Sequence, residues 1–255
     1  MTLIDTHCHL YADEFQDDIS TVIQKAQQVG VQKFYLPAID SSSLEAMYTL
    51  EKQFPNVCLA MMGLHPCYVK ENYQQELAIV QEQLKKRSFP AIGEIGLDFY
   101  WDKTFMQQQY DAFHLQMQWA LEYQLPIVIH TRNAMQETIN AVKPFAQKGL
   151  KGIFHCFSGS YESAKQIIDL GFFLGIGGVS TYKNAGLPEV ISKIGINNLV
   201  LETDAPYLSP VPYRGKRNES SYLTYVVEKI AACLQISAEE VATATTANAQ
   251  QIFKY

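Results

Sequence analysis

The chain has 255 residues, 47% of them hydrophobic, which suits one large domain with a complete core. It contains no run near the ~18 apolar residues of a membrane-spanning helix, and residues 1–10 carry neither the basic segment nor the cleavage site of a signal peptide, so we expect a cytoplasmic protein with no membrane partner. The net charge of −6 argues against a surface coated with phosphate-binding lysines, although buried metal cations could supply a positive field locally.

Short apolar segments alternate with longer amphipathic segments along the whole chain. The amphipathic segments predict helices, such as 105–123, and two more at 220–235 and 237–253 follow the last strand. Most apolar segments are nearly continuous, which is typical of parallel strands covered on both faces. They predict strands at 3–9, 31–38, 57–65, 91–98, 126–131, 150–157, 172–178 and 198–204.

This alternation of strands and helices predicts an α/β fold with a parallel sheet. We expect a (β/α)8 TIM barrel with an extra C-terminal helix, since such a barrel takes about 250 residues. An open, doubly wound sheet is the structural alternative. No linker, low-complexity segment or shift in composition marks a boundary, so residues 1–255 are expected to form a single domain.

The cysteines are odd in number and lack the spacing of a zinc knuckle. This favours free thiols in a reducing compartment over a disulfide framework. Each is expected to be a small core or pocket residue rather than a ligand. They are Cys8, Cys58, Cys67, Cys156 and Cys233.

Five of the six histidines lie at or near the C-terminal end of a predicted strand, where barrels gather their catalytic groups. The first two, His7 and His9, share one side of the strand predicted at 3–9 if its side chains alternate, and Asp5 would support them from below. Imidazole is the commonest metal ligand in proteins. The HxH pattern therefore predicts a metal-binding pair rather than two hydrogen-bonded core histidines.

Glu94 lies inside the strand predicted at 91–98, between Gly93 and Gly96. A carboxylate inside a barrel needs a cation or several hydrogen-bond donors. The strands expected to face it offer no interior lysine or arginine, so we expect Glu94 to bridge two cations with its two oxygens. Asp98, near the end of the same strand, is either a helix cap or a support for a ligand.

The remaining candidate ligands also follow apolar segments. His130 and His155 end the predicted strands 126–131 and 150–157, and Asp204 ends 198–204. Closure of the barrel would bring Asp204 beside the HxH pair, and Glu202 would line the barrel below it.

These residues sort into two predicted metal sites that share Glu94. Mixed nitrogen and oxygen ligands with open positions are typical of catalytic sites, and two cations ~3.5–4 Å apart stabilise both the attacking and the leaving oxygen in hydrolysis. Asp204 could orient the attacking water or accept its proton. The first site comprises His7, His9, Glu94 and Asp204, and the second comprises Glu94, His130 and His155.

The chain closely resembles the TatD family of metal-dependent DNases, within the wider amidohydrolase-like barrels. The matching segments are DTHCHL (5–10), GLHP (63–66), GEIGLDFY (93–100), PIVIHTRNA (126–134), FHCFSG (154–159) and LETDAPYLSPVPYRGKRNE (201–219). The resemblance implies a TIM barrel, hydrolysis of phosphodiesters and the ligands just named. The family usually has proline after RGKRNE, where this chain has Ser220. No lysine takes the place of Glu94, which favours the DNase-like branch over the dihydroorotase-like and phosphotriesterase-like branches.

The resemblance also implies that His65, in GLHP, lies by the substrate. It could donate to a phosphate oxygen or protonate the leaving group as a catalytic residue, and an equally good alternative is a supporting contact with Glu94. Arg132 suits a phosphate fork, or a surface ion pair. The basic loop, defined as Arg214, Lys216 and Arg217, could reach a phosphate backbone or could simply be solvated.

Several aromatic residues lie on the predicted loops that follow strands. They could stack on the bases of single-stranded DNA, or they could only pack the loops. Of these aromatic residues, Tyr161 is included among the predicted substrate contacts. The other aromatic residues on these loops are Phe99, Tyr100, Trp101 and Tyr207.

We therefore expect an exonuclease-like deoxyribonuclease with two divalent cations, acting on single-stranded DNA or 3′ ends and needing no obligate protein partner. The resemblance implies activity with Mg²⁺, whereas several imidazole ligands favour Zn²⁺, Mn²⁺ or Ni²⁺. The alternative function is a small-molecule metallohydrolase of the amidohydrolase superfamily. The predicted metal ligands suit both functions.

Overall fold

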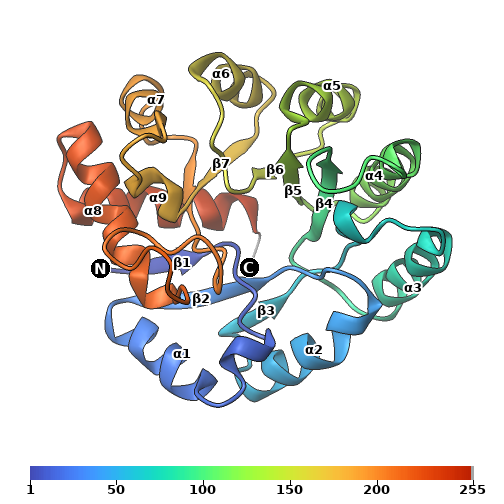
Figure 1. Cartoon of the computed structure of the whole chain (residues 1–255), viewed down its shortest axis with the longest axis horizontal. Coiled ribbons are helices and arrows are strands. Elements are labelled where there is room, and N and C mark those ends of the chain that lie inside the picture. Colours follow the sequence, from blue (N-terminus) through green and yellow to red (C-terminus); the bar gives the residue numbers. More distant parts are fainter. Residues whose placement is uncertain (254–255) are drawn as a thin grey trace.

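The computed structural model describes residues 1–253 and has an inner layer of parallel strands surrounded by helices (Figure 1). The strands are β1 (Leu3–Asp5), β2 (Val31–Leu36), β3 (Cys58–Ala60), β4 (Ile92–Asp98), β5 (Ile127–Arg132), β6 (Gly152–Phe154), β7 (Phe173–Ile176) and β8 (Leu199–Leu201). The helices are α1 (Ile19–Gln28), α2 (Leu44–Gln53), α3 (Tyr73–Lys86), α4 (Met106–Glu122), α5 (Met135–Ala146), α6 (Tyr161–Asp169), α7 (Leu187–Ile194), α8 (Leu223–Leu234) and α9 (Ala238–Ile252).

The strands follow one another around a barrel in chain order. Regular pairing gives one sheet of β1-β2-β3 and another of β4-β5-β6-β7-β8. Backbone hydrogen bonds cross both seams between these sheets: Gly93 N donates to Met62 O at 2.9 Å, and Thr6 N donates to Leu201 O at 3.0 Å. The predicted TIM-barrel fold is confirmed, and the open-sheet alternative is not needed.

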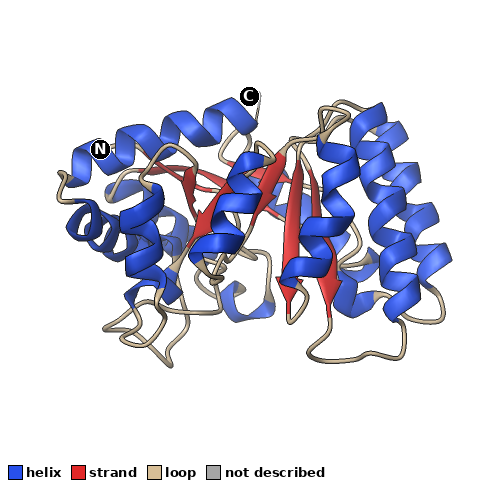
Figure 2. Cartoon of the chain, turned by 90° about the horizontal axis from the view of Figure 1, so that it is seen from above, coloured by secondary structure: helices blue, strands red, loops and turns tan. Residues whose placement is uncertain are grey.

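Each strand, or the residue directly before it, contributes an apolar side chain to the barrel interior. These side chains form one buried cluster with the end of α9, where the ring of Phe253 stacks on Tyr35 with centroids 3.8 Å apart. In Figure 2 the strand arrows point away from α9, so this extra C-terminal helix closes the end at which the strands begin. The clustered strand residues are Ile4, Tyr35, Leu59, Ala91, Val128, Ile153, Phe173 and Val200.

Several strands are shorter than predicted at their C-terminal ends. β1 ends at Asp5, four residues before the predicted boundary, and β3, β6 and β8 end at Ala60, Phe154 and Leu201. The backbone after β1 still donates to both neighbouring strands, for example from Cys8 N to Tyr35 O, but it no longer forms a regular ladder. Most candidate ligands therefore lie on the first residues of the loops, so strand alternation alone does not orient them.

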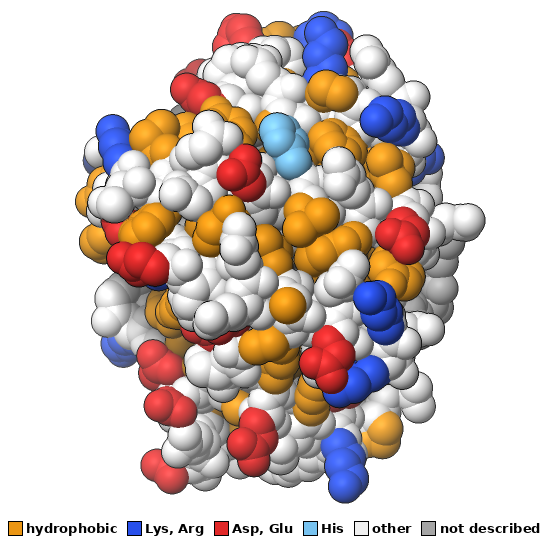
Figure 3. Space-filling view, turned by 90° about the vertical axis from the view of Figure 1, so that its right-hand side faces the viewer, with side chains coloured by type: hydrophobic (Ala, Val, Ile, Leu, Met, Phe, Trp, Pro, Cys, Tyr) orange, Lys and Arg blue, Asp and Glu red, His pale blue; other side chains and the backbone are white. Residues whose placement is uncertain are grey.

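The outer surface on the side of α3 and α4 shows no large patch of like charge. Acidic and basic side chains are interspersed on this face (Figure 3), and pairs such as Lys86–Glu82 join neighbouring turns. Among residues 1–253, no helix has both the length and the apolar character needed to cross a membrane.

Candidate metal centre

The carboxylate of Glu94, on β4, divides the neighbouring histidines into two groups. Its Oε2 lies 3.2 Å from Nε2 of His7 and 3.8 Å from Nε2 of His9. Its Oε1 lies 2.9 Å from Nδ1 of His130 and 3.1 Å from Nε2 of His155. The sequence predicted the same two groups, and the structure brings all five residues together at the C-terminal end of the barrel.

Asp204 joins the first group from the loop after β8. Its Oδ1 lies 3.6 Å from Nε2 of His7 and 3.5 Å from Nε2 of His9, and its backbone N–H donates to His7 O at 2.9 Å. Its φ of 57° is in the left-handed region, which aspartate tolerates better than most residues. This turn directs the carboxylate towards the histidine pair.

Hydrogen bonds behind the histidines fix which ring nitrogens carry protons. Tyr11 Oη donates to Pro37 O at 2.6 Å, so it can only accept at its 3.0 Å contact with His9 Nδ1. Nδ1 of His9 therefore carries the proton, and the lone pair of Nε2 points towards Glu94 and Asp204.

Carboxylates fulfil the same role behind the second group. Nε2 of His130 hydrogen-bonds with Asp98 Oδ2 at 2.8 Å. Nδ1 of His155 forms no hydrogen bond within residues 1–253, but Glu202 Oε1 lies 3.4 Å from it, within ion-pair distance. Protons on these nitrogens leave a lone pair on the opposite ring nitrogen of each histidine, facing Oε1 of Glu94. Partners of this kind commonly orient metal-binding histidines.

Two observations indicate that cations complete this arrangement. Lone pairs of His9, His130 and His155 face carboxylate oxygens at 3.8 Å or less, which is repulsive unless a proton or a metal ion lies between them. Within residues 1–253, neither Glu94 nor Asp204 pairs with a lysine or arginine. Imidazole nitrogens and carboxylate oxygens are suitable ligands for divalent cations, so these residues could hold a metal ion.

The surrounding histidines also determine the charge of the two carboxylates. Although burial favours neutral forms, His65, His155 and His7 hold the pKa of Glu94 well below its usual value. Burial likewise opposes ionisation of Asp204, but His9, His155 and His7 keep its pKa lowered. Both carboxylates are therefore anionic and available to cations.

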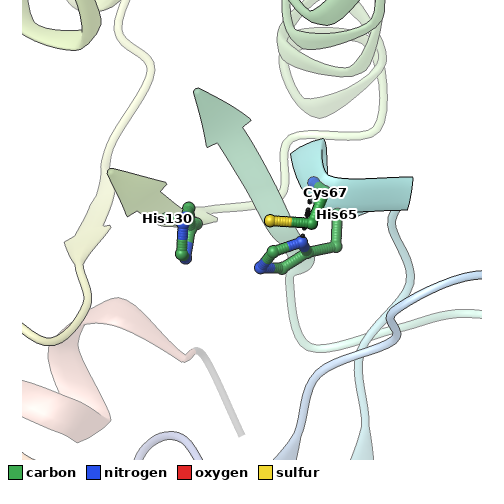
Figure 4. A group of neighbouring side chains, drawn as sticks. All are labelled: His65, Cys67 and His130. Atoms are coloured by element: carbon green, nitrogen blue, oxygen red, sulfur yellow. Dashed lines mark hydrogen bonds between the residues drawn. The ribbon is translucent and has the colours of Figure 1, made fainter. Parts of the chain in front are cut away.

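His65 differs from the other histidines of the site. Its Nδ1 accepts a hydrogen bond from Cys67 N at 3.0 Å (Figure 4), so its proton is on Nε2, which lies 3.3 Å from Glu94 Oε1. The neutral ring is thus a donor towards the centre, whereas His9, His130 and His155 offer lone pairs. Figure 4 also shows the half-buried Cys67 thiol directed towards His130, a neighbour of the site that the sequence pattern did not single out. Burial and the nearby Asp98 raise the pKa of Cys67 to about 12, so it remains a thiol.

The sequence indicates Asp98 and Glu202 but does not settle how they support the ligands. Asp98, left open between a helix cap and a support, is a support, because its Oδ2 contacts Nε2 of His130 at 2.8 Å. Its Oδ1 accepts from the backbone N–H groups of Tyr100 and Trp101 at 2.9 and 3.1 Å, but these residues lie in a loop, and α4 begins only at Met106. Gly175 on β7 leaves space for the Glu202 carboxylate, which a Cβ at that position would overlap.

The predicted substrate contacts other than His65 lie outside this cluster. Arg132, Arg214 and Lys216 are exposed. Arg217 instead binds Asp18 with both terminal nitrogens, at 2.8 and 2.7 Å, and fastens the loop after β8 to the start of α1. Tyr161 begins α6, with Nζ of Lys193 5.6 Å from its ring centroid, and makes no contact with the histidine cluster.

Exposed aromatic and apolar side chains gather around the same end of the barrel. The ring of Tyr207 lies 6.0 Å from that of His9, and the ring of Tyr68 lies 6.0 Å from that of His65. Apart from Met1, every exposed large hydrophobic residue within 1–253 lies on a loop after β3, β4 or β8. They are Tyr68, Tyr100, Trp101, Tyr207, Leu208 and Val211.

Comparison with known proteins agrees with this site. A family model described as TatD related DNase matches residues 4–254. A metal-dependent hydrolase of Bacillus subtilis, YabD, is 37% identical over 99% of both chains. A protein of Erwinia tasmaniensis named 3′-5′ ssDNA/RNA exonuclease TatD is 30% identical, covering 98% of this chain and 99% of its own.

The solved structures give the same relationship. The crystal structure of YjjV, a TatD homologue from Escherichia coli, matches with a TM-score of 0.93 and 29% identity over 99% of this chain and 98% of its own. Family model, relatives and structure all extend over essentially the whole chain. The chain therefore belongs to the TatD-related DNase family of metal-dependent hydrolases.

Proposed function

We propose that this hydrolase cleaves phosphodiester bonds of DNA and releases nucleotides from the 3′ ends of single strands. The observation that carries the proposal is the division of the Glu94 oxygens between two groups of ligands. Phosphodiester hydrolysis suits such a pair of sites because charge develops on both the attacking and the leaving oxygen.

The two sites would be held by different parts of the barrel. His7, His9, Glu94 and Asp204 would hold one divalent cation, and Glu94, His130 and His155 would hold the other. When bound, the cations acidify water and neutralise charge on the phosphate. We propose Mg²⁺ as the ion that supports activity, with Zn²⁺, Mn²⁺ or Ni²⁺ as alternatives that these imidazole ligands can bind.

Asp204 is the proposed base. The lone pairs of His9, His130 and His155 are directed at the cation sites, so the carboxylates are the remaining acceptors. The side chain of Asp204 is 15% exposed and that of Glu94 only 3%, so an incoming water can reach Asp204 more easily. Asp204 would therefore orient the water and accept its proton.

His65 is proposed to act on the substrate rather than on a cation. Because Cys67 N–H occupies its Nδ1, the proton on Nε2 is available to a phosphate oxygen or to the leaving group. This favours the substrate role for His65 over a purely supporting contact with Glu94.

DNA as the substrate is supported by the name of the Erwinia relative and by the residues around the C-terminal end of the barrel. Arg132, Arg214 and Lys216 are exposed cations that can contact phosphates. We propose weaker contributions from Arg217, whose guanidinium is already paired, and from Tyr161, which stands apart from the cluster.

The test is release of mononucleotides from a single-stranded oligodeoxynucleotide, with Mg²⁺ and after chelation, for the wild type and Glu94→Gln. Labels at either end establish the polarity, and an RNA strand of the same sequence tests sugar specificity. We expect Mg²⁺-dependent release from the 3′ end that Glu94→Gln abolishes. Absence of release, combined with hydrolysis of small esters or amides, would favour the small-molecule metallohydrolase, which the ligand set also permits.

A further inference from the structure

A compact, exposed group of side chains at the C-terminal end of the barrel, which we call the stacking group, comprises Tyr100, Trp101 and Arg132. Tyr100 is 50% exposed and Trp101 68% exposed. The guanidinium carbon of Arg132 lies 3.9 Å from the Tyr100 ring centroid and 5.0 Å from that of Trp101. Large apolar side chains left this open to water commonly mark a binding surface.

Asp98 ties the stacking group to the metal centre. One of its oxygens accepts from the backbone N–H groups of Tyr100 and Trp101, and the other contacts Nε2 of His130. The backbone N–H of Phe99 also donates to Arg132 O at 2.9 Å. The loop is therefore anchored in the active end of the barrel, although its aromatic rings are exposed.

We propose that the stacking group binds the face of an unpaired base in the nucleotide next to the scissile phosphate. This inference rests on the proposed function and adds the part of the substrate that is recognised. Arg132 follows His130 by two residues on β5, which places it about 7 Å further along the strand. One nucleotide can span that distance.

The chemistry of the group suits a base followed by a phosphate. Bases stack on aromatic rings without regard to sequence, because every base has a π face. Arg132 is held over the rings but, within residues 1–253, forms no ion pair with a carboxylate, so its donors remain available to a phosphate oxygen. A base inside a duplex offers no free face, so the group selects single strands.

Fluorescence of Trp101 tests this contact without any turnover. The chain has two tryptophans, and the other, Trp119, is 5% exposed in the core, so Trp119→Phe leaves Trp101 as the reporter. Adding Glu94→Gln to the same chain prevents cleavage, so the DNA strand stays intact during the measurement. We expect an oligodeoxythymidylate to quench Trp101 and a strand of abasic sites of equal length and charge to leave it unchanged. Equal quenching by both strands, or by neither, overturns the proposal.

Kinetics with the same two strands give a second test. We expect the wild type to favour the base-containing strand and Trp101→Ala to lower its kcat/KM for that strand about tenfold or more. Trp101→Phe should restore most of the preference because it retains a stacking ring. A Trp101→Ala enzyme that keeps the full preference overturns the base contact. A wild type that cleaves neither strand refutes the proposed nuclease function instead, while the fluorescence test still decides the contact.

Discussion

The two halves of the metal centre are backed differently. On the β5 and β6 side, a carboxylate lies behind each histidine ring: Asp98 is 2.8 Å from His130, and Glu202 is 3.4 Å from His155. An anion behind a histidine raises the basicity of its ligand nitrogen and fixes its ring. We therefore expect this half to hold its cation more firmly.

The β1 and β8 side has a weaker framework. His9 is backed by the neutral hydroxyl of Tyr11. Within residues 1–253, Nδ1 of His7 and Nδ1 of His155 both lack a hydrogen-bond partner, but only that of His155 has a carboxylate within ion-pair distance. In exchange, this half has Asp204, a carboxylate partly open to the mouth. The difference suggests a division of roles in which one half retains its ion and the other brings water and base together.

Removal of Glu94 should have the largest effect, because its two oxygens face the histidines of both halves. We expect Glu94→Ala to lower turnover by about 10³-fold or more, the upper range for loss of a group that stabilises developing charge. Metal content should fall at both sites. Circular dichroism should show a retained fold, and a variant that keeps near-wild-type activity at saturating Mg²⁺ would contradict the shared role.

Asp204→Asn separates the two functions assigned to the β1 and β8 side. Asparagine keeps the shape and one oxygen ligand but cannot accept a proton at neutral pH. We expect metal and DNA binding to persist while single-turnover cleavage falls by about 10²-fold or more. His7→Ala should instead lower metal occupancy at this site and spare the other. Unimpaired cleavage by Asp204→Asn with full metal content would show that another group is the base.

Glu202→Gln and Tyr11→Phe compare the two kinds of backing directly. Glu202→Gln removes the charge behind His155 and should weaken metal affinity by about 10- to 100-fold, as loss of such partners does. Tyr11→Phe removes only a neutral hydroxyl, so its effect should be several times smaller. Zn²⁺ titration against a competing chelator measures both. If Tyr11→Phe weakens metal binding as much as Glu202→Gln, the proposed asymmetry fails.

The structure brings together the candidate ligands that the sequence predicts, whereas the sequence indicates less about the residues behind them. Glu94, His130, His155 and Asp204 are recognisable because each polar residue stands within or directly after an apolar strand, and barrel closure brings strand ends together. Tyr11 acts through a side-chain direction beyond the strand end, which no periodicity reports. Alternation along the predicted strand places Glu202 in the barrel, but not behind His155. The HxH pair was predicted from strand alternation, yet β1 ends at Asp5 and the loop places both rings.

The basic loop shows the same limitation. Its three cations look equivalent in the sequence, but Arg217 is paired with Asp18, which lies far away in the chain. Only the folded contacts distinguish an anchor from a free cation.

Replacing Arg214 and Lys216 with Ala should weaken binding of single-stranded DNA and lower its salt dependence by roughly 0.7 in log–log slope per lost phosphate contact. The matched control replaces Lys148 and Lys151, two exposed lysines at the opposite end of the barrel. Affinity measured across a salt titration should respond only to the first pair. Equal responses would mean that the basic loop contributes no more than general charge.

Arg217→Ala should have the smallest effect on DNA and should act on stability instead. The ion pair with Asp18 is bidentate but partly exposed, so we expect a loss of about 1 kcal/mol or less in the free energy of unfolding. Its hydrogen bonds with Arg217 lower the pKa of Asp18 from the ordinary 3.8. The stability that the Asp18–Arg217 pair contributes is therefore present at neutral pH. It is lost as the pH falls below 3.8 and through the lowered pKa of folded Asp18, so the difference in stability between wild type and variant should shrink there. Urea unfolding at neutral and acid pH measures this, with Asp18→Asn as the reciprocal variant. If Arg217→Ala leaves stability unchanged but weakens DNA binding as much as Arg214→Ala, the guanidinium leaves Asp18 for a phosphate, and all three cations of the loop bind the strand.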